Sequence, residues 1–369
     1  MKKKTIVKLI IVIILIISGL LIYFTGTYES LKVKAINYFE NTLNKKGVEL
    51  IKGTGSLIDK ATLSSLEDSG ITGSNYNFNS IDNVYYSILE DNEKELYKQI
   101  YANIEAVKTD FKPVKKINKD KIGDIVEAVF NDHPELFWVY TNYSYKYINE
   151  GEVVQITLSY NSTSKNLDKS KELFNSKVDE IVNEASQYTE DYYKEKYVHD
   201  KLIKMNKYDD NEKLNQSAYS AIVTGKTVCA GYSRAFMYIM NKLGIRTYYI
   251  TGDSNGDHSW NIVELENEYY NVDLTWDNQK KISYRYFNVP DSIFTKTHIR
   301  KDLSIYLPVC RGSKYYNYES KVITKTKPNG EVEVENIKPN KESTKQEKII
   351  EEDDLFDYNE LYNNEEFYE

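Results

Sequence analysis

The stretch between residues 225 and 277 constrains the fold most, because it changes from helical to strand-like periodicity just after a cysteine. It opens with GKTVCAGYSRAF, in which residues that are poor helix formers lead into Cys229. The apolar positions that follow recur at helical spacing and end at a glycine that favours a helix stop: Tyr232, Phe236, Ile239, Met240, Leu243 and then Gly244. Three strand-like stretches come next, RTYYITG, HSWNIVEL and EYYNVDLTW. The sequence therefore predicts a helix that begins near Cys229 and is followed by strands.

A position at a helix N-terminus would give the thiol of Cys229 a chemical role. Unpaired backbone N–H groups and the helix dipole stabilise a thiolate there. The N–H of the cysteine itself would also point to where the oxyanion of a tetrahedral intermediate forms. The alternative is a buried packing cysteine, since free cysteines are among the most buried residues. We therefore treat Cys229 as a candidate nucleophile with a structural alternative.

A thiolate needs a base, and strand parity favours His258 together with Asp273. If Glu266-Asn267 is a two-residue turn, Trp260 lies opposite Asp273. Because His258 shares the face of Trp260, Asp273 and His258 become diagonal neighbours on that face. A four-residue loop gives the same result, whereas an odd loop would separate them. In such an arrangement the imidazole shares the thiol proton, and the carboxylate fixes the tautomer of the imidazole.

Other polar residues near this stretch are weaker candidates. Asp257 is adjacent to His258 and would point to the opposite face of a strand. Asp277 follows the last strand and is a rival orienting carboxylate, less well placed than Asp273. The amide of Gln216 is a candidate donor to an oxyanion, although capping or solvent exposure in the preceding helix is the more ordinary role.

The remaining histidines have ordinary structural explanations, and no metal site is predicted. His133 precedes a proline and marks a helix end. His199 is expected to pack or to lie on the surface of a helix, and His298 is expected to be exposed within a charged stretch. No histidine–cysteine cluster has metal-ligand spacing, so neither a metal nor another cofactor is predicted.

The segments GKTVCAGYSRAF, DHSWNIVEL and YYNVDLTWD, in this order and at these separations, resemble the bacterial branch of the transglutaminase-like superfamily. The resemblance spans about residues 195–300. It implies an α+β fold with a papain-like core, in which a helix bearing the cysteine packs on an antiparallel sheet bearing the histidine and the carboxylate. It also implies that Cys229 is the nucleophile, His258 the base and Asp273 the residue that orients the base.

One departure from the family pattern concerns the substrate. Animal transglutaminases and papain-type proteases place a tryptophan directly after the cysteine, whereas Ala230 stands there in this chain. The superfamily includes cross-linking enzymes, peptidases, amidases and catalytically silent relatives. The resemblance therefore implies a thiol-dependent acyltransferase or hydrolase acting on protein or peptide amides, with the outcome of the reaction open. The alternative is a silent surface-binding module that uses the tyrosine-rich hairpin at residues 137–160.

The second cysteine, Cys310, lies in LPVCRGSKYY, without a helix or a nearby base. A disulfide between Cys229 and Cys310 is the structural alternative for a chain outside the cell. That disulfide would disable a nucleophilic Cys229. If Cys229 is catalytic, we expect Cys310 to be a free thiol or an intermolecular link.

Residues 1–27 are predicted to anchor the chain in a membrane. Lysines flank the start of an uncharged run from Leu9 to Phe24, which is slightly short of the roughly 20 residues of a spanning helix. No small-residue cleavage pattern follows, which favours a retained signal anchor over a cleaved signal peptide. The positive-inside rule then predicts a single-pass membrane protein with its bulk, and its protein or peptide substrate, outside the cytoplasm at the cell envelope. The net charge of −8 offers no basic surface for nucleic acid.

Composition and periodicity divide the chain into six regions. Helices are expected from Val84 and over residues 122–130, and residues 168–207 return to helical periodicity. The last thirty residues are acidic and lack a periodic core. The predicted regions are a signal anchor at 1–27, a juxtamembrane spacer at 28–82, an α/β accessory region of helices and a hairpin at 83–165, a transglutaminase-like domain at 166–310, a hairpin at 311–339 and a disordered tail at 340–369.

Overall fold

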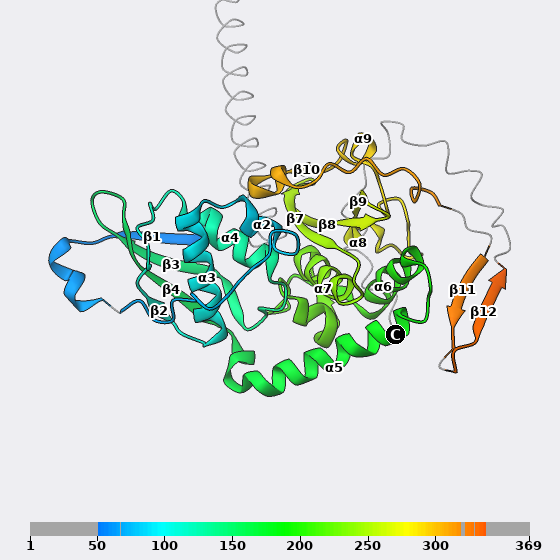
Figure 1. Ribbon diagram of the computed structural model, residues 1–369, viewed down its shortest axis with the longest axis horizontal. Helices are drawn as coiled ribbons and strands as arrows, with labels where there is room; N and C mark the ends of the chain where they lie inside the picture. Colours follow the sequence, from blue (N-terminus) through cyan, green and yellow to red (C-terminus); the bar gives the residue numbers. More distant parts are fainter. Residues whose placement is uncertain (1–50, 67, 319–321, 328, 337–369) are drawn as a thin grey trace, which may run out of the picture. The chain divides into compact units, whose positions relative to one another are not determined.

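The computed structural model of the 369-residue chain describes residues 51–66, 68–318, 322–327 and 329–336 (Figure 1). The anchor predicted at 1–27 and the tail predicted at 340–369 lie outside the described residues. Contacts divide the chain after Gly47 into two units, and all described residues belong to the unit that begins at Val48. Within the described part, no helix has both the length and the apolar character needed to cross a bilayer. The described fold combines helices with separate sheets, which confirms the α+β class.

The first sheet is built on the hairpin expected from the tyrosine-rich stretch. Its strand order is β1-β3-β4-β2, with β1 parallel to β3 and the other neighbours antiparallel. A Cβ at Gly53 would collide with the ring of Tyr143, so the glycine lets this ring lie across β1. Part of the range expected to be a spacer is therefore a sheet strand. The strands are β1 (Gly53–Leu57), β2 (Asp110–Phe111), β3 (Val139–Tyr147) and β4 (Val153–Tyr160).

Three helices belong to the same part of the chain as this sheet. Two of them divide the helical pattern that begins at Val84. The helical pattern from Val84 is broken because Glu90 and Glu93 form a capping box, which satisfies free N–H groups and starts a new helix. The third helix ends at His133, before Pro134, as predicted. This helix contacts the strand Thr247–Asp253 of the second sheet. The helices are α2 (Val84–Ile88), α3 (Asp91–Glu105) and α4 (Ile122–Asp132), and the short η1 (Lys60–Ser65) precedes them.

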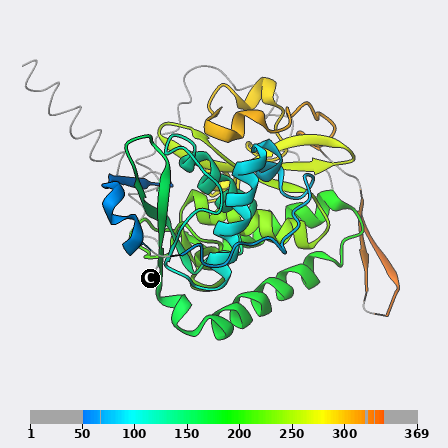
Figure 2. The same cartoon turned by 60° about the vertical axis from the view of Figure 1, so that its left-hand side comes forward.

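The helical pattern over residues 168–207 corresponds to two helices. In both Figure 1 and Figure 2 the first of them, α5, runs along one side of the drawn fold. The second, α6, packs against α5 and against the helix that begins at Cys229. The elements of this stretch are η2 (Ser162–Asn166), α5 (Leu167–Ala185), α6 (Asp191–Met205), β5 (Lys207–Tyr208), η3 (Ser220–Thr224) and β6 (Lys226–Thr227).

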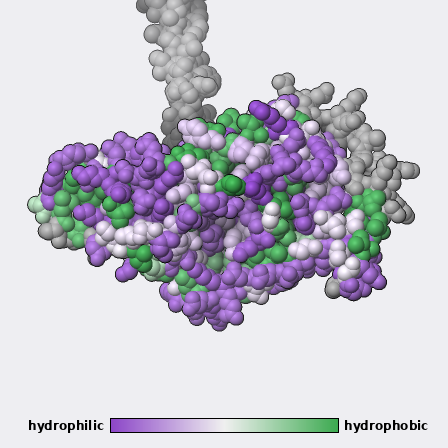
Figure 3. All heavy atoms as spheres, viewed as in Figure 1, coloured by the Kyte–Doolittle hydropathy of each residue, from purple (hydrophilic) through white to green (hydrophobic). Residues whose placement is uncertain are grey.

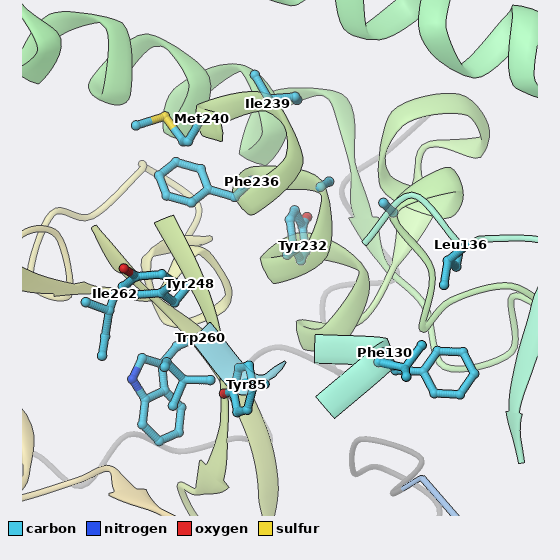
Figure 4. Close-up of a cluster of buried hydrophobic side chains, with 14 of the residues drawn as sticks. Tyr85, Phe130, Leu136, Tyr232, Phe236, Ile239, Met240, Tyr248, Trp260 and Ile262 are labelled. Carbon is cyan, nitrogen blue, oxygen red and sulfur yellow. The ribbon is translucent and has the colours of Figure 1, made fainter. Parts of the chain in front are cut away.

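The second sheet and the helix α7 (Cys229–Lys242) form the core of the predicted transglutaminase-like region. Gly244 follows α7 with a φ of 77°, the left-handed conformation expected of a helix stop. The sheet is fully antiparallel, with the order β10-β7-β8-β9, and α7 packs on β7 and β8. Figure 4 shows apolar side chains of α7 facing those of the sheet. The strands are β7 (Thr247–Asp253), β8 (Asp257–Leu265), β9 (Glu268–Val272) and β10 (Ile299–Arg300).

Short elements close the described fold. The hairpin expected within residues 311–339 is present as two paired strands at 322–326 and 332–336. The Thr189 amide donates to the carbonyl of Thr324 in the first of these strands. On the face drawn in Figure 3, hydrophilic residues cover most of the surface, with smaller groups of hydrophobic residues between them. The elements are α8 (Leu274–Asp277), α9 (Asp291–Phe294), η4 (Asp302–Tyr306), β11 (Val322–Thr326) and β12 (Val332–Asn336).

Candidate active site

Cys229 is the first residue of α7, the position expected from the sequence. The side chain of Val228, the N-cap residue, accepts no hydrogen bond from the helix. The N–H groups of the first helical turn have no acceptor within the helix. They are therefore available to stabilise negative charge at or near the sulfur. The thiol is buried, with Cys229 only 1% exposed, and it packs in a small cluster with Ala230, Met237 and Tyr249.

A glycine two residues after Cys229 lets the start of α7 approach the preceding segment closely. A Cβ at Gly231 would collide with the Thr227 side chain and the Asn215 carbonyl. The hydroxyl of Thr227 donates to that same carbonyl over 2.9 Å. The segment before α7 is thereby held against the first turn of the helix. This local packing fixes where the Cys229 side chain begins.

His258 is the second residue of β8, and its ring reaches the carboxylate of Asp273. His258 Nε2 lies 2.7 Å from Asp273 Oδ2, and both side chains are buried. The strand register explains this approach, since Leu265 pairs with Glu268 across a two-residue turn at Glu266-Asn267. The parity argument had placed the two residues as diagonal neighbours on the basis of that register. The structure therefore brings the candidate base and its candidate orienting residue together.

Asp273 lies one residue beyond β9, where it is also the N-cap of α8. Its Oδ1 accepts the N–H of Thr275 at 2.8 Å and that of Trp276 at 3.2 Å. Such capping holds the carboxylate in one orientation. Burial alone would raise the pKa of Asp273, but the charge of His258 and hydrogen bonds from His258 and His298 hold that pKa well below its usual range. Asp273 is therefore an anion at neutral pH.

His258 carries the complementary charge. Burial lowers the pKa of this imidazole, but the negative charges of Asp273 and of a Cys229 thiolate outweigh burial and raise its pKa to about 10. The ring is therefore protonated near neutral pH when those charges are present. A protonated imidazole between a carboxylate and a thiolate is the arrangement that thiol acyl chemistry requires.

His298 was predicted to be exposed, and that prediction is wrong. His298 is 1% exposed, and its Nε2 lies 3.0 Å from Asp273 Oδ2, the same oxygen that contacts His258. Its ring stacks on Phe294 with the ring centroids 4.0 Å apart. No periodic pattern marks residue 298, because it lies in the loop between α9 and β10 among charged neighbours. Only the folding of this loop over the sheet brings the ring to Asp273.

His258, Asp273 and His298 are also the one group in the described part whose geometry suits a metal ion. Hydrogen bonds account for the arrangement without an ion. The Asp273 oxygen lies at hydrogen-bond distance from both rings, and the second carboxylate oxygen is already satisfied by two backbone N–H groups. The geometry is that of a carboxylate which accepts from two histidines.

The rival carboxylates lie elsewhere. Asp277 Oδ2 is 3.3 Å from His199 Nε2, in a fully buried pair on the far end of α8. Burial lowers the pKa of His199, but the hydrogen bond with Asp200 and the negative charges of Asp200 and Asp277 outweigh burial and raise that pKa. The fully buried ring occupies the position of a packing residue. Asp257 faces Lys301, with Oδ1 3.6 Å from Nζ. Neither carboxylate forms a hydrogen bond or ion pair with His258.

Gln216 and the two cysteines complete the residues considered from the sequence. The carbonyl of Gln216 accepts from Arg234 Nη1 at 2.5 Å, and its side-chain Oε1 is buried without a partner among the described residues. Cys229 and Cys310 are both free and buried, which excludes a disulfide between them in this structure. Burial raises the pKa of the Cys310 thiol, so it is a poor nucleophile.

A comparison with protein families identifies one part of the chain. Residues 179–274 match the family model described as the transglutaminase-like superfamily. This range contains Cys229, His258 and Asp273, and it excludes His298. No curated protein sequence matches the chain.

Two solved structures are similar over a minority of the chain. One is described as a "TGase", at 16% identity and a TM-score of 0.27, with 42% of this chain and 50% of that chain covered. The other is described as "a Putative Cysteine Protease from Cytophaga hutchinsonii", at 14% identity and a TM-score of 0.26, with 41% and 62% covered. The chain thus spans about half to three fifths of the proteins that it matches.

Proposed function

We propose, from the premise that residues 179–274 belong to the transglutaminase-like superfamily, that this protein is an extracytoplasmic, thiol-dependent acyl-transfer enzyme acting on protein or peptide amides. The observation that carries the proposal is the buried contact of His258 with Asp273, together with the interaction of His258 with Cys229 at the start of α7. A buried cation paired with a buried carboxylate supports an adjacent thiolate. Cys229 is the proposed nucleophile, His258 the proposed acid and base, and Asp273 the proposed orienting residue.

The first half of the reaction breaks an amide bond. The Cys229 thiolate attacks the carbonyl carbon of a carboxamide or peptide bond, and the carbonyl oxygen becomes an oxyanion. Backbone N–H groups at the start of α7 are the available donors to that oxyanion. His258 then gives a proton to the nitrogen, which leaves as ammonia or an amine while the acyl group stays on sulfur as a thioester.

The second half of the reaction releases the acyl group. His258, now neutral, takes a proton from an incoming amine or water, which attacks the thioester carbonyl. The products are a new amide or a carboxylic acid, together with the restored thiolate and imidazolium. Transfer and hydrolysis use the same residues of this chain, so the acceptor decides between them. Because Cys229 and His258 are both buried, side chains over the sulfur must move before a substrate reaches it.

The proposed location outside the cytoplasm rests on the sequence of the first residues. Lys2, Lys3, Lys4 and Lys8 precede the apolar run that ends at Phe24. A retained anchor with its lysines inside would place the enzyme at the outer face of the membrane. The substrates would then be envelope or extracellular proteins and peptides.

The test is the rate at which iodoacetamide alkylates Cys229 in the full chain at pH 6. An ordinary thiol, with a pKa near 8.5, is almost fully protonated at that pH, whereas a thiolate paired with imidazolium is not. We expect Cys229 to react at least tenfold faster than in the variant His258→Ala. Peptide mass spectrometry separates this reaction from that of Cys310, which is the matched buried thiol.

Equal rates in the wild type and in His258→Ala would contradict the proposal. If Cys229 does react as a thiolate, a glutamine-containing peptide offered with a primary amine distinguishes the two outcomes. Transfer would release ammonia and give a peptide–amine product, and hydrolysis would release ammonia and give a glutamate peptide.

The alternative is a binding module that uses the tyrosine-rich hairpin of β3 and β4. One observation weakens it, because Tyr143 in that hairpin is 5% exposed and covers Gly53 of β1 instead of facing solvent. Tyr140, which is 40% exposed, is the more accessible tyrosine of the strand. Slow alkylation of Cys229 that is independent of His258 would favour this alternative.

A further inference from the structure

A cavity of about 70 Å³ lies between the accessory region and the segment that precedes α7. One wall is apolar and comes from α4 and the start of β3, with Phe130, Leu136 and Val139 as members. Figure 4 shows Phe130 and Leu136 beside the ribbon that follows α4. The opposite wall is polar and includes Gln216 and Arg234. The lining contains lysine and arginine but no aspartate or glutamate.

Arg234 is a buried cation without a matching anion. The residue is 6% exposed, and its guanidinium lies over the ring of Tyr249 with 4.6 Å between the guanidinium carbon and the ring centroid. Its Nη1 donates a hydrogen bond to the carbonyl of Gln216. It makes no ion pair with a carboxylate among the residues that the structure describes. Buried charges in proteins are normally paired, so a guanidinium with donors to spare on a cavity wall favours an anionic ligand.

Two further groups give the cavity a preference for part of a peptide. The buried Oε1 of Gln216 has no hydrogen-bond partner in the described part, and a peptide N–H is a donor that would satisfy it. Lys213, at the exposed rim, adds a second positive charge. A ligand with a carboxylate on a short apolar stem fits this cavity. The carboxylate would contact the Arg234 guanidinium on the polar wall, and the stem would contact the apolar side chains on the opposite wall.

The cavity is close enough to Cys229 to act on the same substrate. Arg234 follows Cys229 by five residues on α7, which is about 7.5 Å along the helix axis. Tyr249 links the two, because its ring carries the Arg234 guanidinium and also packs in the cluster that contains Cys229. An extended peptide advances about 3.3 Å per residue. A group held at Arg234 is therefore about two to four residues from an acyl group on the sulfur.

We propose that this cavity is a carboxylate-binding subsite, in which Arg234 selects peptides that carry a carboxylate two to four residues from the reacting amide. The proposal rests on the proposed function in one respect, because the peptide bound in the cavity is taken to be the substrate of the enzyme. The carboxylate comes either from an acidic side chain or from the C-terminus of the peptide. Arg234 acts as the recognition residue, and Lys213 contributes charge at the entrance.

Binding is measured separately from turnover in the full chain with Cys229→Ala, by calorimetric titration of three peptides. The first is acetyl-Ala-Gln-Ala-Glu-amide, which carries a side-chain carboxylate. The second is acetyl-Ala-Gln-Ala-Ala with a free C-terminus, and the third is the neutral acetyl-Ala-Gln-Ala-Gln-amide. We expect one or both carboxylate peptides to bind at least tenfold more tightly than the neutral peptide, because a charge-assisted hydrogen bond is lost in the neutral one. The tighter of the two identifies the source of the carboxylate.

Two variants locate the preference. Arg234→Met keeps the length of the side chain and should abolish the discrimination, whereas Lys213→Met should reduce it less than threefold. If Arg234→Met does not fold, Val139→Phe fills the cavity from its apolar wall, leaves Arg234 in place, and should weaken carboxylate peptides at least tenfold.

The proposal is overturned by equal affinity for the three peptides, by no measurable binding of any, or by discrimination that survives both Arg234→Met and Val139→Phe. These outcomes differ from failure of the proposed function, which appears instead as alkylation of Cys229 that does not depend on His258. An enzyme with a fast thiolate and no carboxylate preference would leave the function standing and remove the subsite.

Discussion

The substitution His298→Phe tests how much one hydrogen bond contributes to keeping Asp273 ionised inside the protein. A carboxylate only accepts hydrogen bonds, so His298 must donate from Nε2. Its Nδ1 lies 2.8 Å from the Thr297 hydroxyl, which donates to it when the ring is neutral. Burial lowers the pKa of His298, which agrees with a neutral ring. Phenylalanine keeps the stacking on Phe294 and removes the Nε2 donor. It also removes the Nδ1 acceptor, but the Thr297 hydroxyl still has the carbonyl of Phe294 as an acceptor, at 3.3 Å.

The expected loss follows from the charge of the acceptor. A hydrogen bond to a charged group contributes about 1.5–3 kcal/mol, more than a neutral one. We therefore expect the free energy of unfolding at pH 7 to fall by about 2 kcal/mol. The folded-state pKa of Asp273 lies below its unfolded value, so its contribution is present above the unfolded value and is lost as the pH falls through the folded value. In the folded state, the pKa of Asp273 is higher in the variant than in the wild type. As the pH falls between these two pKa values, the difference in free energy of unfolding between wild type and variant becomes smaller.

Urea unfolding of the full chain at pH 7 measures this difference, with His298→Gln as the matched control. The amide nitrogen of glutamine can take the place of the imidazole Nε2, so His298→Gln should recover most of the loss. Equal stability of His298→Phe and the wild type would refute the reasoning. So would an equal loss in both variants, because the effect would then come from ring packing rather than from the donor.

Two further predictions concern the surroundings of the site. Burial raises the pKa of Glu195 to about 8, and among the described residues Asn288 is the one hydrogen-bond partner of its carboxyl group. The folded state therefore holds a proton that the unfolded state releases near pH 4.5. The free energy of unfolding should therefore fall by up to about 1.4 kcal/mol per unit as the pH rises from 5 to 8, and Glu195→Gln should flatten that slope in urea titrations. Gly231→Ala should lower the free energy of unfolding by about 1–3 kcal/mol, because the added Cβ collides with backbone and side-chain atoms. The same substitution should slow the alkylation of Cys229. An unchanged melting temperature would contradict the close packing at Gly231.

Local sequence signals predicted the elements that carry the site. The apolar positions after Cys229 follow the 3.6-residue period, and Gly244 ends the helix with a positive φ, so α7 is encoded by residues close together in the chain. The diagonal relation of His258 to Asp273 also follows from local information. Its two requirements are a two-residue turn and the period of two in a strand, and both hold in the structure.

Local signals failed where a neighbour distant in sequence sets the environment. Residues 53–57 are polar and glycine-rich, yet they form a strand because the rings of β3 cover their glycines. The break between α2 and α3, by contrast, has a local cause, because the capping box of Glu90 and Glu93 starts a new helix within an apolar pattern that continues through it.

The sequence by itself determined that a cysteine begins a helix and that a histidine and a carboxylate share one face of the following strands, because helix and strand periods are local properties of the chain. Only the tertiary structure decided that His298 reaches the same carboxylate oxygen and that Arg234, on a cavity wall, has no anionic partner among the residues described. Both facts depend on which loop or helix folds against the site, and burial and pairing of a polar side chain are set by those distant neighbours.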